Sequence, residues 1–330
     1  MGSGWPAWKP TRNGQMFMKW KKLGKIFDPT DHALPNGCVE FAQSPQALVC
    51  TDFIRVYFAT RQRDAIGKYV SHIAFVDFDR RLSRILGVSK HAAIEVGGLG
   101  AFDEHGIFPM SPVRDGDRVL AYTTGWNRKV SVPVDSSIGL AISTDDGRSF
   151  QKFGTGPVVT TSLHEPFLIA DAFVALRGGT YHMWYIYGTA WAGDPPERVY
   201  KIGHATSADG VAWEKEGRQL IADRLGSSEC QALPTVIHFD GCHHMFFCYR
   251  RQFGFRTDRE GAYRIGYAFS DDFANWTRDD ARAGIDVSPD GWDSDMQCYP
   301  STFECDGNIY LLYNGNEFGR RGFGAAMLER

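Results

Sequence analysis

The chain has 330 residues, of which 43% are hydrophobic and 23% charged, and its formal net charge is -3. This composition is typical of a globular protein with a large core and argues against intrinsic disorder. Because the net charge is small and lysine and arginine form no long run, we expect neither nucleic acid nor a membrane surface as a partner. A neutral or modestly charged ligand fits better.

Seven cysteines form an odd set without a Cys-x-x-Cys pair, so the sequence predicts neither a disulfide framework nor a zinc site. We expect free thiols in a reducing compartment. The amino terminus lacks an apolar segment of secretory length, and no stretch approaches the roughly 20 apolar residues of a membrane helix, so we expect a cytoplasmic protein. Residues 1–15 are expected to be extended or disordered, and the oligomeric state stays open.

A five-fold repeat runs along the chain. Each copy has a short apolar stretch, usually around a proline, then a polar turn and an alternating run rich in aromatic residues. The copies span 42–58, 109–122, 169–185, 231–247 and 297–313. In the last four copies the chain is predicted to reverse at an Asp-Gly or Gly-Gly pair, namely Asp115-Gly116, Gly178-Gly179, Asp240-Gly241 and Asp306-Gly307. Such pairs between alternating runs predict β-hairpins.

A third strand with a glycine in second place recurs about sixty residues apart, at 138–141, 202–205, 265–268 and 323–326. In the first three copies a serine–aspartate turn and an aromatic residue follow and open a fourth strand. The turn at 143–150 matches the Asp-box of sialidases, a structural hairpin to which we assign no catalytic role. Four strands per unit are typical of a propeller blade, and no long 3.6-residue period indicates a helical domain.

We therefore predict one all-β domain over 1–330, a five-bladed β-propeller. The fifth unit reaches Arg330 after its third strand, and the segment 20–27 matches the fourth-strand pattern of 213–217. The amino-terminal strand is thus expected to pair with the last blade and close the ring, which removes an exposed edge. The alternative is an open array of sandwich sheets.

A ring of five such blades resembles the five-bladed glycosidase superfamily, which includes family 43, families 32 and 68, and the mannoside phosphorylases of family 130. The resemblance covers 20–330 and is architectural. Those enzymes place acids at the starts of the innermost strands, often as Asp-Pro-Ser or Glu-Cys-Pro. Here Glu229-Cys230 and Asp171 are similar, although the proline after Glu229-Cys230 is displaced to Pro234. Similar chains are described as glycosylases and often accompany bacterial surface-polysaccharide genes, so the resemblance implies a glycan-active protein without naming the sugar.

Candidate acids come from an alignment of the first strands. The start of a first strand and the end of a second strand share one face of the disc, because the two form an antiparallel hairpin. We align the first strands on Pro45, Pro112, Ala172, Pro234 and Pro300. The positions five residues upstream of these anchors are Glu40, Ile107, Phe167, Glu229 and Asp295. Two residues further upstream in blades 2, 3 and 5 are His105, Glu165 and Asp293. Asp171 lies just before its anchor.

Acids that converge on one axis repel one another and have pKa values driven apart, as general acid/base catalysis on a glycosidic bond requires. We predict Glu229 as the general acid and Asp171 or Glu40 as the base or nucleophile. The alternative for each acid is a structural ion pair with an arginine at the mouth.

Sugar binding requires aromatic planes and paired hydrogen-bond donors, and both occur at the ends of the second strands. The candidate substrate-binding residues are His105, Asp295, Glu165, Arg61, Arg63, Trp126, Arg128, Arg250, Tyr299 and Glu317. The arginines would also suit a phosphate or carboxylate on the ligand. We expect no cofactor and no metal, because metal-binding helix motifs and glycine-rich phosphate loops are missing from the sequence.

These patterns predict a glycoside hydrolase or phosphorylase that acts on an oligo- or polysaccharide in an axial funnel. A non-catalytic glycan-binding propeller is one alternative. A sugar transferase of surface-polysaccharide assembly is another, and fold analogy does not choose among them.

Overall fold

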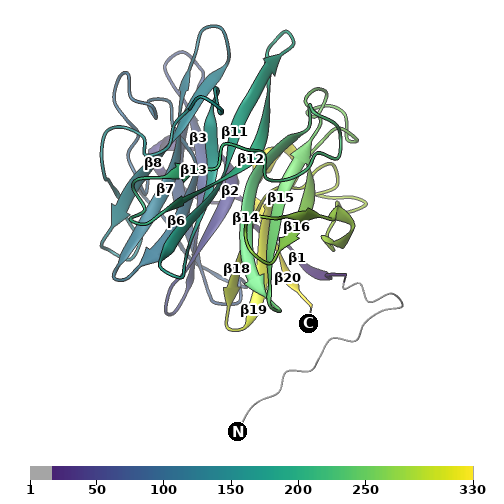
Figure 1. Ribbon diagram of the computed structural model, residues 1–330. Coiled ribbons are helices and arrows are strands. Elements are labelled where there is room, and N and C mark those ends of the chain that lie inside the picture. The colour runs from purple at the N-terminus through teal and green to yellow at the C-terminus, as the bar shows by residue number, and fades with distance from the viewer. Residues whose placement is uncertain (1–16, 330) are drawn as a thin grey trace.

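The computed structural model describes residues 17–329, so the expectation for residues 1–15 lies outside the described residues. The described chain is almost entirely β-structure and forms five four-stranded antiparallel sheets. The sheets stand around a common axis as the blades of a propeller (Figure 1). The predicted all-β, five-bladed architecture is confirmed. No helix in residues 17–329 is long and apolar enough to span a membrane.

Each blade is a meander of four strands, counted here from the axis outward. Blade 1 contains β2 (Glu40–Val49), β3 (Ile54–Arg63), β4 (Tyr69–Phe78) and β5 (Ile85–Val88). Blade 2 contains β6 (Ile107–Asp115), β7 (Arg118–Arg128), β8 (Val134–Ser143) and β9 (Gln151–Lys152). Blade 3 contains β10 (Ile169–Arg177), β11 (Thr180–Ala192), β12 (Glu197–Ser207) and β13 (Glu214–Lys215). Blade 4 contains β14 (Cys230–Phe239), β15 (Cys242–Arg250), β16 (Arg264–Ser270) and β17 (Thr277–Arg278). Blade 5 contains β18 (Cys298–Cys305), β19 (Asn308–Asn314), β20 (Phe323–Leu328) and β1 (Trp20–Phe27).

The two ends of the chain complete the fifth blade, as predicted. Strand β1 pairs antiparallel with β20, with Trp20 opposite Leu328 and Phe27 opposite Phe323. The two strands lie side by side in Figure 1. Packing then continues across the junction to blade 1, where the ring of Phe27 lies 5.0 Å from that of Phe58. The open sandwich array is therefore wrong.

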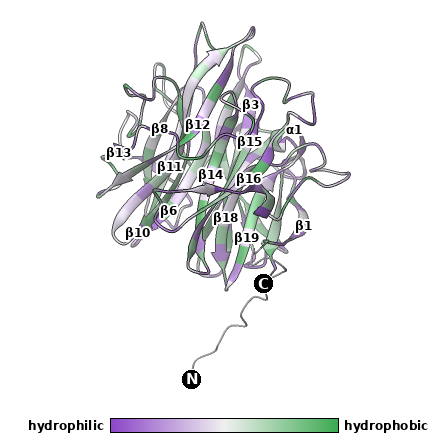
Figure 2. Cartoon of the chain, turned by 45° about the vertical axis from the view of Figure 1, so that its right-hand side comes forward, coloured by the Kyte–Doolittle hydropathy of each residue, from purple (hydrophilic) through white to green (hydrophobic). Residues whose placement is uncertain are grey.

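The hydrophobic core lies between neighbouring blades. Five buried clusters occupy the five junctions, one for each pair of adjacent blades, including the junction of the last blade with the first. Hydrophobic residues, green in Figure 2, run along the strands that face these junctions. Burying one large apolar side chain stabilises a fold by about 1.5–3 kcal/mol, so a closed ring gains from every junction.

Three of the four predicted reversals form at the expected residues, and the turn of blade 2 lies one residue later than predicted, at Gly116 and Asp117. At Asp240-Gly241 both residues have positive φ, 49° and 73°, which a tight hairpin between β14 and β15 requires. In the serine–aspartate turn of blade 2, Tyr57 of blade 1 donates a hydrogen bond of 2.6 Å to the carbonyl of Gly147. A Cβ at position 147 would lie 2.3 Å from that tyrosine oxygen, so this turn needs glycine. Its role is to join blades.

Every innermost strand contains a β-bulge, in which two residues stand opposite one on the neighbouring strand. The bulged pairs are 44–45, 108–109, 171–172, 233–234 and 299–300. In four of them the first residue has positive φ, and in β6 the bulge contains a cis peptide bond between Phe108 and Pro109. The sequence alignment was therefore wrong in blade 2, where the anchor is Pro109 and not Pro112. Bulges redirect side chains, and these five occur where the strands approach the axis.

Candidate active site

A funnel of about 790 Å³ opens at the face of the disc where the innermost strands begin. All five blades line it, and its volume lies within the range of small-molecule sites. The starts of the first strands and the ends of the second strands share this mouth, as predicted. The starts of the third strands also reach it, since each forms a hairpin with the end of a second strand.

The funnel wall is rich in aromatic rings. The aromatic lining residues are Phe41, Tyr69, Phe108, Trp126, Tyr200, Phe255, Tyr263, Tyr299 and Phe318. Phe108 and Tyr299 occupy bulges of different blades, and their rings meet edge to face with centroids 5.6 Å apart. Aromatic faces with polar groups between them offer a sugar ring an apolar surface and hydrogen-bond partners. The wall is therefore suited to a carbohydrate.

Asp171 is the buried carboxylate of the funnel lining; the other lining acids, Asp258, Asp295 and Glu317, are exposed. It occupies the β10 bulge with φ of 56°, and its backbone N–H donates to the hydroxyl of Thr124 in blade 2. Its Oδ2 accepts a hydrogen bond of 3.3 Å from the N–H of Leu233.

Neighbouring bulges show why Asp171 makes this contact. The bulge N–H groups of Ser44 and Asp171 are capped by polar side chains from the second strand of the preceding blade, Asn314 and Thr124. The bulge N–H of Tyr299 is likewise bonded to the sulfur of Cys248 in β15. Asn314 and Cys248 each stand opposite the residue just before a bulge, and the residue at this place in β11 is the apolar Ile186, opposite Ala170. One carboxylate oxygen of Asp171 therefore serves as the acceptor for the N–H of Leu233. The other oxygen, Oδ1, has no hydrogen-bond partner within the described chain.

The environment of Asp171 favours its neutral form. Burial raises the pKa of Asp171 to about 7, and neither the hydrogen bond from Leu233 nor the charge of Arg198 restores its usual value. A carboxyl group with such a pKa is partly protonated at neutral pH and can transfer a proton in either direction. Oδ1 is the oxygen that remains free to meet a ligand.

Three cationic side chains line the funnel together with this acid. Arg61 of β3, Arg198 of β12 and Arg250 of β15 line the funnel, and none of them forms an ion pair within residues 17–329. Arg250 is buried, donates to two backbone carbonyls and to the Tyr200 hydroxyl, and lies 3.6 Å over the ring of Phe255. Its donors are thus partly used by the protein, in contrast to those of Arg61 and Arg198.

Seven of the predicted site residues line the funnel. They are Asp171, Asp295, Arg61, Trp126, Arg250, Tyr299 and Glu317. Asp171, Arg250 and Tyr299 lie deep, whereas Asp295 and Glu317 are exposed near the rim. The structure therefore brings together one predicted catalytic acid and most of the predicted binding residues.

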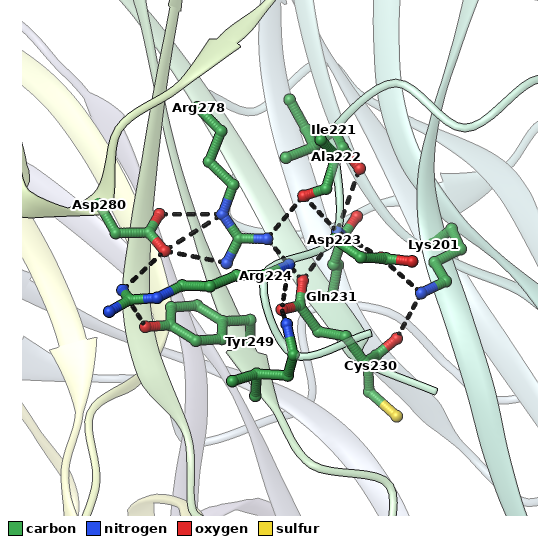
Figure 3. Close-up of polar contacts among 12 residues, drawn as sticks. Lys201, Ile221, Ala222, Asp223, Arg224, Cys230, Gln231, Tyr249, Arg278 and Asp280 are labelled. Atoms are coloured by element: carbon green, nitrogen blue, oxygen red, sulfur yellow. Dashed lines mark hydrogen bonds and ion pairs between the residues drawn. The ribbon is translucent and has the colours of Figure 1, made fainter. Parts of the chain in front are cut away.

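Glu229, the predicted general acid, lies outside the funnel lining. It is fully buried and forms an ion pair of 2.6 Å with Arg278, while the backbone N–H groups of Arg224 and Leu225 donate to its other oxygen. Figure 3 shows the surrounding network, in which Asp280 binds both Arg278 and Arg224. With its oxygens occupied, Glu229 braces blade 4 against the loop before β14.

Glu40 and Glu165 are also held by structural partners. Glu40 accepts from Arg320 at 2.7 Å and from the Tyr69 hydroxyl at 2.9 Å. Burial raises the pKa of Glu40, but these two hydrogen bonds outweigh burial and leave the pKa below its usual value. Glu165 is fully buried, pairs with Lys215 at 2.5 Å, and accepts from Tyr185. Neither residue lines the funnel.

Three further predicted binding residues lie outside the funnel lining. Arg128 pairs with Asp64 at 2.7 Å and so links blades 2 and 1. Arg63 donates to the hydroxyl of Tyr69 within the β3–β4 hairpin, and His105 accepts from the backbone N–H of Arg128 at 3.4 Å. The role of these three residues in sugar binding stays a prediction.

Strand geometry explains which acids turn away. Side chains alternate between the two faces of a strand, and the residues one and three places before a bulge face the funnel, such as Ala170 and Leu168. Glu229 stands four places before its bulge and points to the opposite face, where Arg278 holds it. Glu40 is separated from the bulge at 44–45 by a further bulge at 41–42 and is held by Arg320 and Tyr69. Asp295 precedes β18, so the alternation does not govern it, and it faces the funnel. Sequence reasoning missed Arg198 and Tyr200 because it did not consider the starts of the third strands. The hairpin from β11 to β12 was the available signal.

Solved structures show where this architecture occurs. The chain is similar to BT0996 in its complex with RGII, at 17% identity and a TM-score of 0.72 over 95% of this chain and 92% of that one. It is also similar to the β-1,2-mannobiose phosphorylase of Listeria innocua, at 11% identity and a TM-score of 0.67 over 95% and 97%. A thermostable family-43 glycoside hydrolase aligns at 14% identity and 0.63 over 90% and 91%. The chain thus has the five-bladed propeller fold found among glycoside hydrolases and phosphorylases.

Sequence comparison gives a narrower relationship. No protein-family model matches the chain. It is 38% identical over 321 residues to the uncharacterized protein Rv1502 of Mycobacterium tuberculosis strain H37Rv, which covers 94% of this chain and all of that protein. The protein MT1551 of strain CDC 1551 matches to the same extent. The chain belongs to the family of these mycobacterial proteins.

Proposed function

We propose that the protein is an enzyme that cleaves a glycosidic bond of an oligo- or polysaccharide in the axial funnel, with Asp171 as the proton donor. The observation that carries this proposal is the buried carboxyl group of Asp171 in an aromatic funnel, with a pKa raised to about 7 and one oxygen free. The solved neighbours that act on glycosides support the substrate class by analogy of fold.

The proposed step uses this carboxyl group as a general acid. Asp171 donates its proton to the glycosidic oxygen while the bond between that oxygen and the anomeric carbon breaks. The transition state has oxocarbenium-ion character. In hydrolysis a water molecule adds its hydroxyl group to the anomeric carbon, and its remaining proton restores Asp171. Trp126 and Tyr299 would hold the sugar rings, and Asp295 and Glu317 would accept hydrogen bonds from hydroxyl groups at the rim.

The test is a panel of bacterial and plant oligosaccharides incubated with the protein, with and without inorganic phosphate, followed by chromatography of the products. The expected result is cleavage by the wild-type protein and a loss of at least about 100-fold in the Asp171→Asn variant, as for removal of a general acid. Asp117→Asn is the matched control, because Asp117 is exposed in the β6–β7 turn on the opposite face of the disc. Cleavage at an undiminished rate by Asp171→Asn would reject the assignment.

A further inference from the structure

Two half-buried arginines of the funnel form no side-chain hydrogen bond or ion pair within the described chain. They are Arg61 and Arg198, and the Nε of Arg61 is fully buried without an acceptor. Three other lining arginines have partners: Arg320 pairs with Glu40, Arg256 pairs with Glu197, and Arg250 donates to Tyr200 and to two carbonyls. Arg259 also has no side-chain partner within the described chain, but it is exposed. A buried guanidinium that lacks an acceptor destabilises the fold unless something else provides one.

The surroundings of these arginines define a binding site. The guanidinium of Arg61 lies over the rings of Phe41 at 4.9 Å, Tyr69 at 5.7 Å and Phe108 at 5.9 Å. These rings fix its position but accept no strong hydrogen bond in the guanidinium plane. Arg198 lies over Tyr200 at 5.8 Å.

The two arginines reach the funnel from blades that are not neighbours. Arg61 comes from β3 of blade 1 and Arg198 from β12 of blade 3, and both line the funnel together with Asp171. Burial lowers the pKa of Arg61, and the positive charge of Arg198 lowers it further. Two like charges that face one funnel without a counter-ion indicate that the counter-ion belongs to the ligand.

We propose that Arg61 and Arg198 form an oxyanion subsite in the funnel that Asp171 also lines. Guanidinium groups bind carboxylate, phosphate and sulfate oxygens through paired, charge-assisted hydrogen bonds. The oxyanion is either a free phosphate ion or an acidic substituent on the glycan. A role of this subsite in turnover rests on the proposed function, whereas the binding of an oxyanion to the subsite does not.

The test is calorimetric titration of the full chain with inorganic phosphate, sulfate and D-glucuronate at constant ionic strength, with D-glucose as the neutral probe. The wild-type protein is expected to bind at least one of the three anions. The Arg61→Gln and Arg198→Gln variants are each expected to weaken that binding at least about tenfold, because each removes a charge-assisted contact. Arg148→Gln, on the opposite face, serves as the matched control and is expected to bind like the wild type.

The anion that binds distinguishes the two sources. Preference for phosphate assigns the subsite to a free phosphate ion, and preference for D-glucuronate or sulfate assigns it to an acidic glycan. If the wild type binds none of the anions, or if folded Arg61→Gln and Arg198→Gln proteins bind them as tightly as the wild type, the subsite is refuted. Because the titration needs no turnover, a protein that binds the anion but cleaves no glycan retains the subsite and loses the proposed function.

Discussion

Replacing Asp171 by asparagine is expected to stabilise the fold at neutral and alkaline pH. Asparagine has nearly the same shape, and its side-chain oxygen can accept the hydrogen bond that Leu233 donates to Asp171. The substitution therefore removes chiefly the ionisable group. Since burial raises the pKa of Asp171 to about 7 from its ordinary value of 3.8, the folded state binds this proton more tightly than the unfolded chain.

The sign and size of the effect follow from this difference. Below pH 3.8 the carboxyl group is neutral in both states and exerts no penalty. Between pH 3.8 and 7 the unfolded chain ionises first, so the wild type loses stability as pH rises, and above pH 7 the penalty stays constant. At 1.36 kcal/mol per pKa unit, the penalty is about 2 kcal/mol at pH 5 and about 4 kcal/mol at pH 8.

Urea unfolding of the wild type and of Asp171→Asn, measured at both pH values, gives the two differences in free energy of unfolding. The advantage of the variant is expected to grow by about 2 to 3 kcal/mol from pH 5 to pH 8. The exposed control Asp117→Asn is expected to show no such growth. An advantage of Asp171→Asn that is the same at both pH values would refute the claim that Asp171 is buried with a raised pKa.

Three other predictions follow from the same contacts. The kcat/KM of the wild type is expected to fall as pH rises through about 7, because Asp171 must carry a proton, and a pH–rate profile measures this. Glu229→Gln is expected to lose about 3 kcal/mol of stability in urea unfolding, because Arg278 loses a buried partner, while the folded variant retains its turnover; loss of turnover at full stability would contradict the bracing role. Burial lowers the pKa of His244 to about 4, so its contribution is present above pH 6.5 and is lost as pH falls toward 4. His244→Gln is thus expected to lose about 3 kcal/mol less stability than the wild type over this range, and equal losses would show that His244 is not responsible.

The fold could be predicted from the sequence because its signals are local and repeated. Glycine turns such as Asp240-Gly241 require positive φ, and the match between the segments 20–27 and 213–217 indicates how the ring closes. Each signal depends on a few neighbouring residues, and five copies corroborate one another. The alignment failed where two prolines compete in β6, since only the observed register shows the bulge at Pro109 instead of Pro112.

The candidate site was harder to predict because it depends on side-chain direction and on partners from other blades. Position along the strand placed Glu229 and Asp295 at the same height, but Arg278 from β17 holds the former while the latter faces the funnel. Asp171 was identified correctly as a lining residue because it interrupts an apolar inner strand. Its raised pKa depends on the packing around it, and no local pattern encodes that packing.

The most direct test of glycan cleavage in the funnel is a crystal structure of the Asp171→Asn variant soaked with an oligosaccharide that the wild type cleaves. We predict sugar density in the funnel, with a glycosidic oxygen about 3 Å from the side chain at position 171. Sugar density on another surface, or in the funnel with every glycosidic oxygen beyond reach of that side chain, would contradict the role of Asp171 as proton donor.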